Sequence, residues 1–232
     1  SICFEVHKPS MFIFDGAFPY RGMLRAIQHK NMTKKIWLRR GMFRKGSSIP
    51  VDSIEHFDAV IHPQDRHSNL NEFVQHSLEV LHCPPIIMLE PEEIFSKEKS
   101  RRLLAVPDDC ICIYVQLGAG EINDIESEIR ITLEALTKHE NVYVVLGESL
   151  IGNRIDFDLP RVRIVRDYPN SLYFRGFDAT IQAGGYNSFH ETKFHKIPAL
   201  FFPNLDTGMD DQLARCLVAE EEGWGIVLKS RS

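Results

Sequence analysis

The chain has 232 residues, of which 44% are apolar and 25% charged, as in an ordinary globular protein of one large or two small domains. Its formal charge of −5 argues against a nucleic-acid-binding protein, which usually carries a basic surplus. Apolar runs fall short of the ~18 residues of a membrane span, and five scattered cysteines favour a reducing, cytoplasmic compartment over a disulfide framework.

Short apolar, β-rich runs recur along the chain and predict eight strands. They cover residues 11–15, 34–39, 57–62, 110–118, 141–147, 162–166, 177–182 and 197–203. Several lack polar alternation, which is typical of parallel strands covered on both faces. An apolar stripe of Ile125, Ile129, Leu133 and Leu136 predicts a helix over 123–138. Strands and helices alternate, so we predict an α/β fold with two Rossmann-like, doubly wound parallel-sheet domains, the first incomplete.

The two halves are separated by a stretch that mixes prolines with a charged run. We expect residues 1–87 to form a partial N-terminal domain, 88–109 a linker or bridging segment, and 110–232 a C-terminal domain whose end is missing. The chain does not begin with Met, which indicates a fragment. Cys110 and Cys112 flank one residue of a predicted strand, and packing is their expected role.

Three loops follow predicted strands of the second half, and ligands of open parallel sheets bind at the carboxyl ends of the strands. The first loop is "QLGAGEIND", where Gly118 and Gly120 let the backbone approach a ligand. The helix after it directs free N–H groups and a partial positive charge at the same point, which suits a phosphate. A glycine turn without any ligand is the alternative.

The second loop lies in "IQAGGYNSFHETKFHKIPALFFP". Gly184 and Gly185 allow a sharp turn, and Asn187 or Ser188 can cap the helix that follows. Glu191, one turn further along, can accept hydrogen bonds from two ribose hydroxyls, or it can simply pair with the helix dipole.

The third loop is "PNLDTGMDDQ", in which Asp211 and Gln212 offer an acceptor and an amide to sugar hydroxyls. The alternative is an N-capping Asp followed by an exposed Gln. Taken together, the three loops describe sites for a diphosphate, a ribose and a hexose, which are the parts of a nucleotide sugar.

Residues 177–228 resemble the donor half of the GT-B glycosyltransferases, nearest to the family 28 group of N-acetylglucosamine transferases. The positions that carry the resemblance are Gly184, Gly185, Ser188, Glu191, Pro198, Pro203, Asp211, Gln212 and Gly223. The resemblance implies that Gly118, Gly120 and Ser188 hold the diphosphate, Glu191 the ribose, and Asp211 with Gln212 the donor sugar. Tyr168 lies where such enzymes hold the base, although a packing role for its ring is slightly favoured. His190 and His195 match no motif position and are expected to be structural or surface residues.

The first half resembles the acceptor half of the same fold less specifically. Asp15, Tyr20 and Arg21 would line its cleft, with Asp15 as the candidate general base and loop capping as the alternative. The family's opening strands and first glycine loop, which commonly carry the catalytic base, are absent before Ser1.

The resemblance implies an inverting, metal-independent transferase that needs no cofactor beyond its donor. It would move a hexosyl group, N-acetylglucosamine or a relative, from a UDP-sugar to an acceptor hydroxyl on a glycan or a lipid-linked molecule, with peripheral membrane association as one option. A UDP-sugar 2-epimerase or hydrolase of the same fold is an alternative, and so is a non-catalytic donor-binding subunit of a two-component transferase. The fragment itself can be inactive, and its oligomeric state is not predicted.

Overall fold

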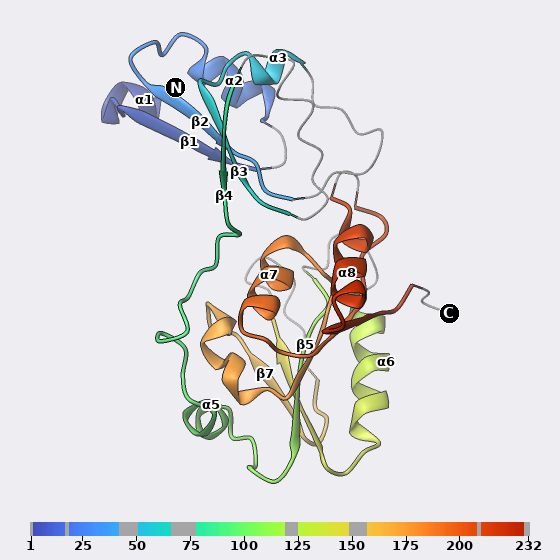
Figure 1. Ribbon diagram of the computed structural model, residues 1–232. Coiled ribbons are helices and arrows are strands. Elements are labelled where there is room, and N and C mark those ends of the chain that lie inside the picture. Colours follow the sequence, from blue (N-terminus) through green and yellow to red (C-terminus); the bar gives the residue numbers. More distant parts are fainter. Residues whose placement is uncertain are drawn as a thin grey trace. The chain divides into compact units, whose positions relative to one another are not determined.

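The computed structural model describes residues 2–16, 19–41, 51–65, 78–118, 125–148, 157–207 and 210–229. The chain divides into two compact units, drawn in Figure 1. Unit 1 comprises Ser1–Ile86 with Gly208–Asp211, and unit 2 comprises Ile87–Thr207 with Gln212–Ser232. Each unit is an α/β structure built on a parallel sheet.

Unit 1 contains a four-stranded sheet whose strands follow one another in chain order. They are β1 (Met11–Asp15), β2 (Lys34–Leu38), β3 (Ala59–Pro63) and β4 (Glu79–Cys83), and all neighbours are parallel. The helices α1 (Ile2–His7), α2 (Arg21–Ile27) and α3 (Val51–Ile54) share one apolar core with this sheet. Trp37 lies fully buried at its centre, between Phe14 and Phe57.

Unit 2 contains a six-stranded parallel sheet in the order β10-β9-β8-β5-β6-β7. Its strands are β5 (Ile111–Gln116), β6 (Val142–Gly147), β7 (Val162–Val165), β8 (Ala179–Gln182), β9 (Ala199–Phe201) and β10 (Gly225–Val227). The chain runs outward from β5 to β7 and then returns to the other side of β5 to begin β8. This is the doubly wound order, whose switch point lies between β5 and β8.

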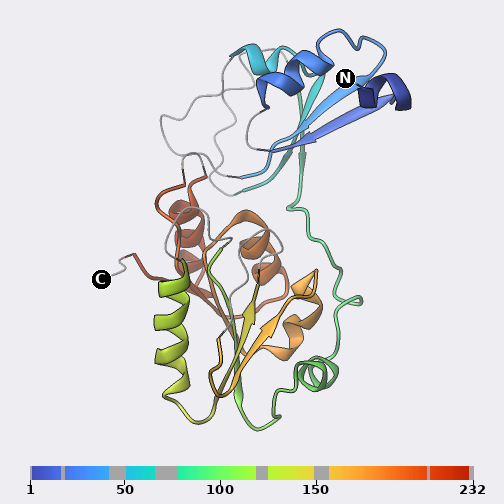
Figure 2. The same ribbon diagram turned by 180° about the vertical axis from the view of Figure 1, so that it is seen from behind.

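Helices cover the two faces of this sheet, because alternate residues of each strand point to opposite sides. On one face, α6 (Ile125–Thr137) packs on β5 and β6 through Ile129 and Leu133 (Figure 2). On the other face, α5 (Lys97–Leu104) and the 3-10 helix η1 (Asn170–Gly176) share a core with Tyr114 of β5. Next to them, α7 (Tyr186–Phe194) and α8 (Gln212–Glu221) pack around Phe201.

The α/β prediction and all eight predicted strands are confirmed, with ends that differ by one or two residues. The sequence missed β4 and β10. The first carries Glu79 and His82 within five residues, and the second is only three residues long. The predicted helix is also confirmed, and Leu133 is fully buried in its core.

Residues 88–109, which we expected to link two domains, are grouped with unit 2 in the structure. The reason is Arg101 of α5, which is 2% exposed. Its guanidinium donates to Asp178 at 2.6 Å and to the carbonyl of Gly176 at 3.2 Å. Cys112 is buried in the adjoining core and Cys110 packs against it, which confirms their packing role.

Candidate functional site

The carboxyl ends of β5 and β8 lie side by side at the switch point of unit 2. Gln116 and Gln182 are register partners there, and the amide of Ala183 donates to the carbonyl of Gln116 at 3.3 Å. The loops that carry Gly118 and Gly184 therefore leave the sheet as neighbours. Ligands of doubly wound sheets bind in this crevice.

Gly184 and Gly185 have different structural roles. Gly184 has φ of +81°, and a Cβ atom there would lie 2.2 Å from Sγ of Cys216. Only glycine fits this turn without strain. Gly185 is the N-cap of α7, and a Cβ atom on it would meet no described atom within 4 Å. The first N–H groups of α7 thus begin beside open space.

The expectation that Asn187 or Ser188 caps α7 is wrong, because the helix begins earlier, at Tyr186. The N-cap residue is Gly185, which has no side chain to bond these N–H groups. Among the described residues no side chain caps α7, and such a helix start suits an anion.

Arg215 of α8 lies beneath the glycine turn, and the sequence analysis did not identify it. Its side chain is fully buried, and Nη1 donates to the carbonyl of Gly184 at 3.0 Å. Arg215 lies next to Cys216 in the buried stripe of α8, where an arginine is out of place. That position is the signal that could have revealed it.

Ser188 and Glu191 lie one turn apart on α7 and are both half-buried. Burial raises the pKa of the Glu191 carboxyl to about 7, while a hydrogen bond with the backbone of Met88 acts in the opposite direction. The carboxyl group is therefore held in a partly desolvated position.

A chain of polar side chains runs under the same edge of the sheet. Asn170 Nδ2 donates to Tyr114 Oη at 3.0 Å, and that hydroxyl donates to Oε1 of Gln116 at 3.2 Å. Burial raises the pKa of Tyr114, which keeps the hydroxyl neutral. Gly147 leaves the space for it, because a Cβ atom there would lie 2.1 Å from Tyr114 Oη.

The loop after β7 is the predicted position of the base. Arg166 pairs with Glu148 at 2.5 Å, and Asp167 accepts a hydrogen bond from Tyr173. Tyr168 is 64% exposed, so the packing role that we slightly favoured for its ring is wrong. The ring is available to a ligand instead.

Gln212 lies beside the glycine turn, because a Cβ atom on Gly184 would be 3.8 Å from the carbonyl oxygen of Gln212. Gln212 begins α8 in unit 2, and its Oε1 accepts from the amide of Asn204 at 3.0 Å. Asp211 is grouped with unit 1. Gly120 lies outside the described residues, and Gly118, with φ of +116°, is the last described residue of its loop.

The acceptor-side predictions all fall in unit 1. Asp15 ends β1 and forms a two-pronged ion pair with Arg40, in which Nε and Nη2 each donate at 2.8 Å. Tyr20 is the exposed N-cap residue of α2, and Arg21 is the first residue of that helix. His190 of α7 and His195, the C-cap residue of that helix, pack their rings on aromatic neighbours, in line with the structural or surface role that we expected.

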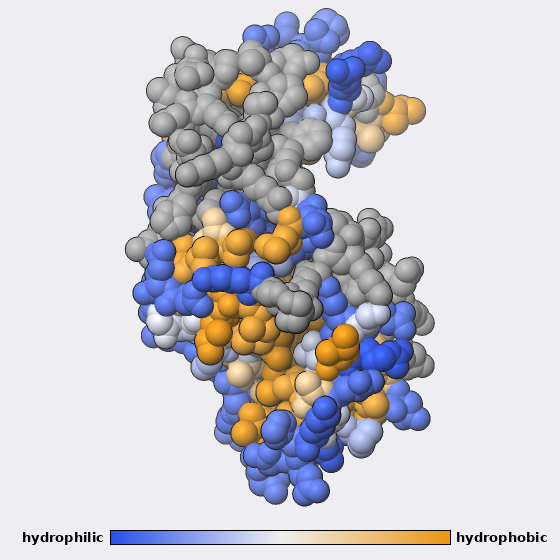
Figure 3. Space-filling model, turned by 90° about the vertical axis from the view of Figure 1, so that its right-hand side faces the viewer, coloured by the Kyte–Doolittle hydropathy of each residue, from blue (hydrophilic) through white to orange (hydrophobic). Residues whose placement is uncertain are grey.

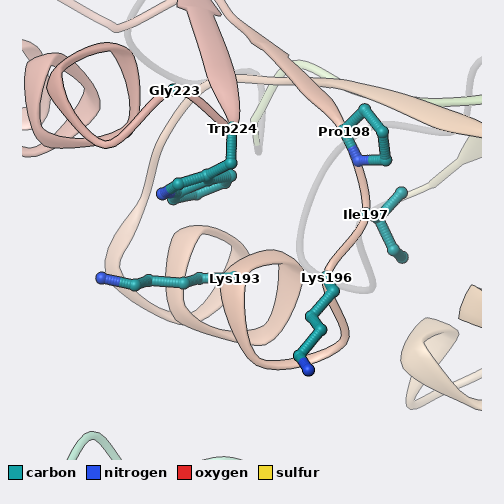
Figure 4. A pocket seen from close by; sticks show the side chains of 6 residues that line it. All are labelled: Lys193, Lys196, Ile197, Pro198, Gly223 and Trp224. Carbon is teal, nitrogen blue, oxygen red and sulfur yellow. The ribbon is translucent and has the colours of Figure 1, made fainter.

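Two cavities, of about 380 and 420 Å³, lie at the opposite, amino edge of unit 2 and share Pro198, Gly223 and Trp224. Figure 4 shows the Trp224 ring above the side chain of Lys193 in the first. The second lies over the apolar face of β8, β9 and β10, where Ile226 is 61% exposed. Apolar side chains also gather in the view of unit 2 in Figure 3. The predicted donor-site residues line neither cavity.

No family model matches the chain, and neither does any curated protein. Solved structures do match it. The spinosyn rhamnosyltransferase SpnG superimposes with a TM-score of 0.65 at 16% identity, over 98% of this chain and 61% of that one. The chain has the GT-B glycosyltransferase fold.

Two further GT-B structures bear on the comparison. SpnG complexed with thymidine diphosphate matches with a TM-score of 0.63 at 17% identity, over 99% of this chain and 62% of that one. MurG of Acinetobacter baumannii matches with a TM-score of 0.57 at 13% identity, over 97% of this chain and 61% of that one. The chain thus spans about three fifths of the length of these GT-B proteins.

Within the described residues, no helix combines the length and apolar character needed to cross a membrane. The same part of the chain contains no group of three or more His, Cys, Asp or Glu side chains placed to hold a metal ion.

Proposed function

We propose that unit 2 binds the nucleoside diphosphate of a sugar donor at the switch point between β5 and β8. We further propose that the full-length protein transfers a hexosyl group, N-acetylglucosamine or a relative, from a UDP-sugar to an acceptor hydroxyl. The observation that carries the proposal is the position of Glu191, half-buried one turn behind the open N-terminus of α7. The GT-B fold supports it, because the solved structures that match include glycosyltransferases, one of them complexed with thymidine diphosphate.

In such a transfer, negative charge builds up on the departing diphosphate while the anomeric carbon becomes cationic. The first N–H groups of α7, which start beside the open space at Gly185, would donate to the phosphate oxygens. The buried guanidinium of Arg215 holds the turn in place and adds positive charge beneath it. One well-placed donor to such developing charge contributes about 3 kcal/mol to transition-state stabilisation.

The other parts of the donor have matching residues in unit 2. The Glu191 carboxylate would accept hydrogen bonds from the two ribose hydroxyls, and Ser188 would contact the diphosphate. The base would lie by the loop of Tyr168. Gln212 would turn its amide to the hexose, since its carbonyl oxygen already accepts from Asn204.

The chemistry on the acceptor side is assigned to unit 1. Asp15 is our proposed general base, with Tyr20 and Arg21 as acceptor contacts. Its carboxylate is held by the two hydrogen bonds from Arg40. Inversion at the anomeric carbon and independence of metal remain part of the proposal, as does a glycan or lipid-linked acceptor.

Two other functions use the same donor site. A UDP-sugar 2-epimerase or hydrolase would need the nucleotide site but no acceptor, and a non-catalytic subunit would need a partner that supplies the rest. Incubation of the full-length protein with labelled UDP-sugar separates them. A glycosylated acceptor supports the transferase, an epimer or free sugar supports the second function, and activity only with a stoichiometric partner supports the third.

Titration calorimetry with UDP, TDP, GDP and CMP tests the donor site itself. An intact site should bind one of the diphosphates, and a ligand at 100 times its Kd should raise the free energy of unfolding by about 2.7 kcal/mol. Absence of binding to all four nucleotides in the full-length protein would overturn the proposal.

A further inference from the structure

Gln116, the last residue of β5, places a carboxamide at the edge of the sheet where β5 and β8 end. It is the register partner of Gln182, so both side chains lie on the same face of the sheet. Gln182 Nε2 donates to Oγ1 of Thr192 at 2.7 Å, which shows that α7 covers this face. The half-buried carboxamide of Gln116 therefore lies on the same face, and at the same edge, as the start of α7.

Tyr114 holds one end of this carboxamide. Its hydroxyl has a single proton and donates it to Oε1 of Gln116 at 3.2 Å. The same hydroxyl accepts a hydrogen bond from Nδ2 of Asn170 at 3.0 Å. Tyr114 is 1% exposed, so water does not compete for these bonds. The side-chain oxygen of Gln116 is thus occupied within the protein.

The amino group of the same carboxamide is the end that remains for a ligand. Among the described residues, no atom accepts a hydrogen bond from Nε2 of Gln116. The first N–H groups of α7, behind the N-cap Gly185, are further donors at this edge. A ligand bound here would have to supply acceptors, and phosphate oxygens are strong acceptors.

We propose that Gln116 contacts the diphosphate of the sugar donor, with Nε2 donating to a phosphate oxygen, and that Tyr114 and Asn170 are positioning residues for this amino group. The inference rests on the proposed donor site and adds a polar contact to it. The direction of the hydrogen bonds is what matters. If Tyr114 donated to Asn170 instead, the carboxamide of Gln116 would turn over and present its oxygen, which repels a phosphate.

Two substitutions of Gln116 test the contact. Gln116→Met removes the donor and keeps the length of the side chain, whereas Gln116→Glu keeps the shape and replaces the donor with a negative charge. We expect the affinity for UDP to fall about tenfold in the first and about a hundredfold in the second. Uridine, which has no phosphate, should bind both variants as it binds the native protein. Calorimetry with the full-length protein measures these affinities.

The pH provides a readout that a defect in folding would not change. The carboxyl group introduced by Gln116→Glu can donate a hydrogen bond once it is protonated. The ratio of variant to native affinity for UDP should therefore rise as the pH falls from 8 to 5. This ratio cancels any pH dependence of Glu191, which both proteins contain. UDP affinity in Gln116→Glu equal to or above the native value would overturn the inference, because the side-chain oxygen would then face the ligand.

Asn170→Asp tests the positioning role without changing Gln116. A carboxylate cannot donate, so Tyr114 would donate to it and the carboxamide of Gln116 would turn over. We expect UDP affinity to fall about tenfold. In a Tyr114→Phe protein the same change should have no further effect, because the hydroxyl that transmits it is absent. Equal losses in the two backgrounds would overturn the positioning role of Tyr114 and Asn170.

NMR of the ¹⁵N-labelled side-chain amide of Gln116 separates this inference from the proposed function. If UDP does not bind but inorganic pyrophosphate shifts the amide signals, the phosphate contact is supported and the proposed function is overturned. If UDP binds and both Gln116 variants keep the native affinity, the proposed function is supported and the contact is overturned. If neither UDP nor pyrophosphate shifts these signals, the contact is overturned as well.

Discussion

The guanidinium of Arg215, buried in α8, donates to the main-chain carbonyl of Gly184, 31 residues earlier in the chain, at 3.0 Å. This bond ties the turn at the start of α7 to the next helix of unit 2. It also places a cation under the point where we propose that the diphosphate binds. Arg215 is therefore expected to affect both folding and nucleotide binding.

Arg215→Met tests that expectation. It keeps most of the side-chain volume but leaves the carbonyl of Gly184 without its buried donor, which costs about 1–3 kcal/mol in the free energy of unfolding. Nucleotide affinity should fall as well. Arg163→Met, at an exposed position of β7, is the control and should change neither quantity. Full nucleotide affinity in a folded Arg215→Met protein would contradict the role assigned to the charge.

The two glycines of the turn should respond differently to alanine. Gly184→Ala forces a left-handed φ of +81° on an L-residue and places Cβ against Cys216. The backbone term alone costs about 1–2 kcal/mol. Gly185→Ala meets open space among the described atoms at a φ of −59°, so its free energy of unfolding should change little. Its methyl group would stand at the proposed phosphate position, and nucleotide affinity should fall. Chemical denaturation measures the free energy of unfolding of each variant, and calorimetry measures its nucleotide affinity. If the two variants behaved alike in both measurements, the different roles assigned to the two glycines would be contradicted.

Glu191→Ala should weaken UDP binding far more than His195→Ala, because only Glu191 is assigned to the ribose. Both side chains are half-buried, Glu191 on α7 and His195 at its C-cap, so the comparison controls for packing. Calorimetry with each variant measures the difference. Equal losses of UDP affinity in the two variants would indicate that Glu191 makes no contact with the ribose.

Nucleotide affinity should also depend on pH. Burial raises the pKa of Glu191 to about 7, and the ionised carboxylate is a stronger acceptor for the ribose hydroxyls than the protonated form. Affinity should therefore increase from pH 6 to pH 8 and level off above that. Calorimetric titration with UDP at a series of pH values measures this dependence. An affinity that does not change with pH would show that Glu191 does not contribute to UDP binding.

The same rise in pKa means that the ionised Glu191 carboxylate destabilises the folded state. This destabilisation begins above the unfolded pKa of about 4.5. The folded state holds the proton more tightly, so stability contributed by the protonated form is lost as the pH rises from about 4.5 to about 7. Glu191→Gln cannot ionise, and we expect it to be more stable than the native protein at pH 8, by up to about 3 kcal/mol. It should nevertheless bind UDP less tightly. Denaturation at pH 5 and pH 8 measures the difference, which should be small at pH 5.

Parts of the site could be read from the sequence because they depend on short-range geometry. Gly184, Ser188 and Glu191 lie within eight residues, so the turn and one helical turn place them on one side of α7. The boundary of α7 could not be read in the same way. Asn187 and Ser188 are good capping residues, yet the helix begins before them, because Gly184 is held between Cys216 and Arg215 of α8.

The sequence by itself determined the alternation of strands and helices in both halves, since apolar periodicity is a local property of the chain. It also determined the glycine turn, whose φ of +81° no other residue tolerates well. Only the tertiary structure decided that β8 returns beside β5 and that Arg215 lies under the turn. These contacts join residues 31 to 66 positions apart, and contact over such distances depends on how helices and strands pack rather than on any local pattern.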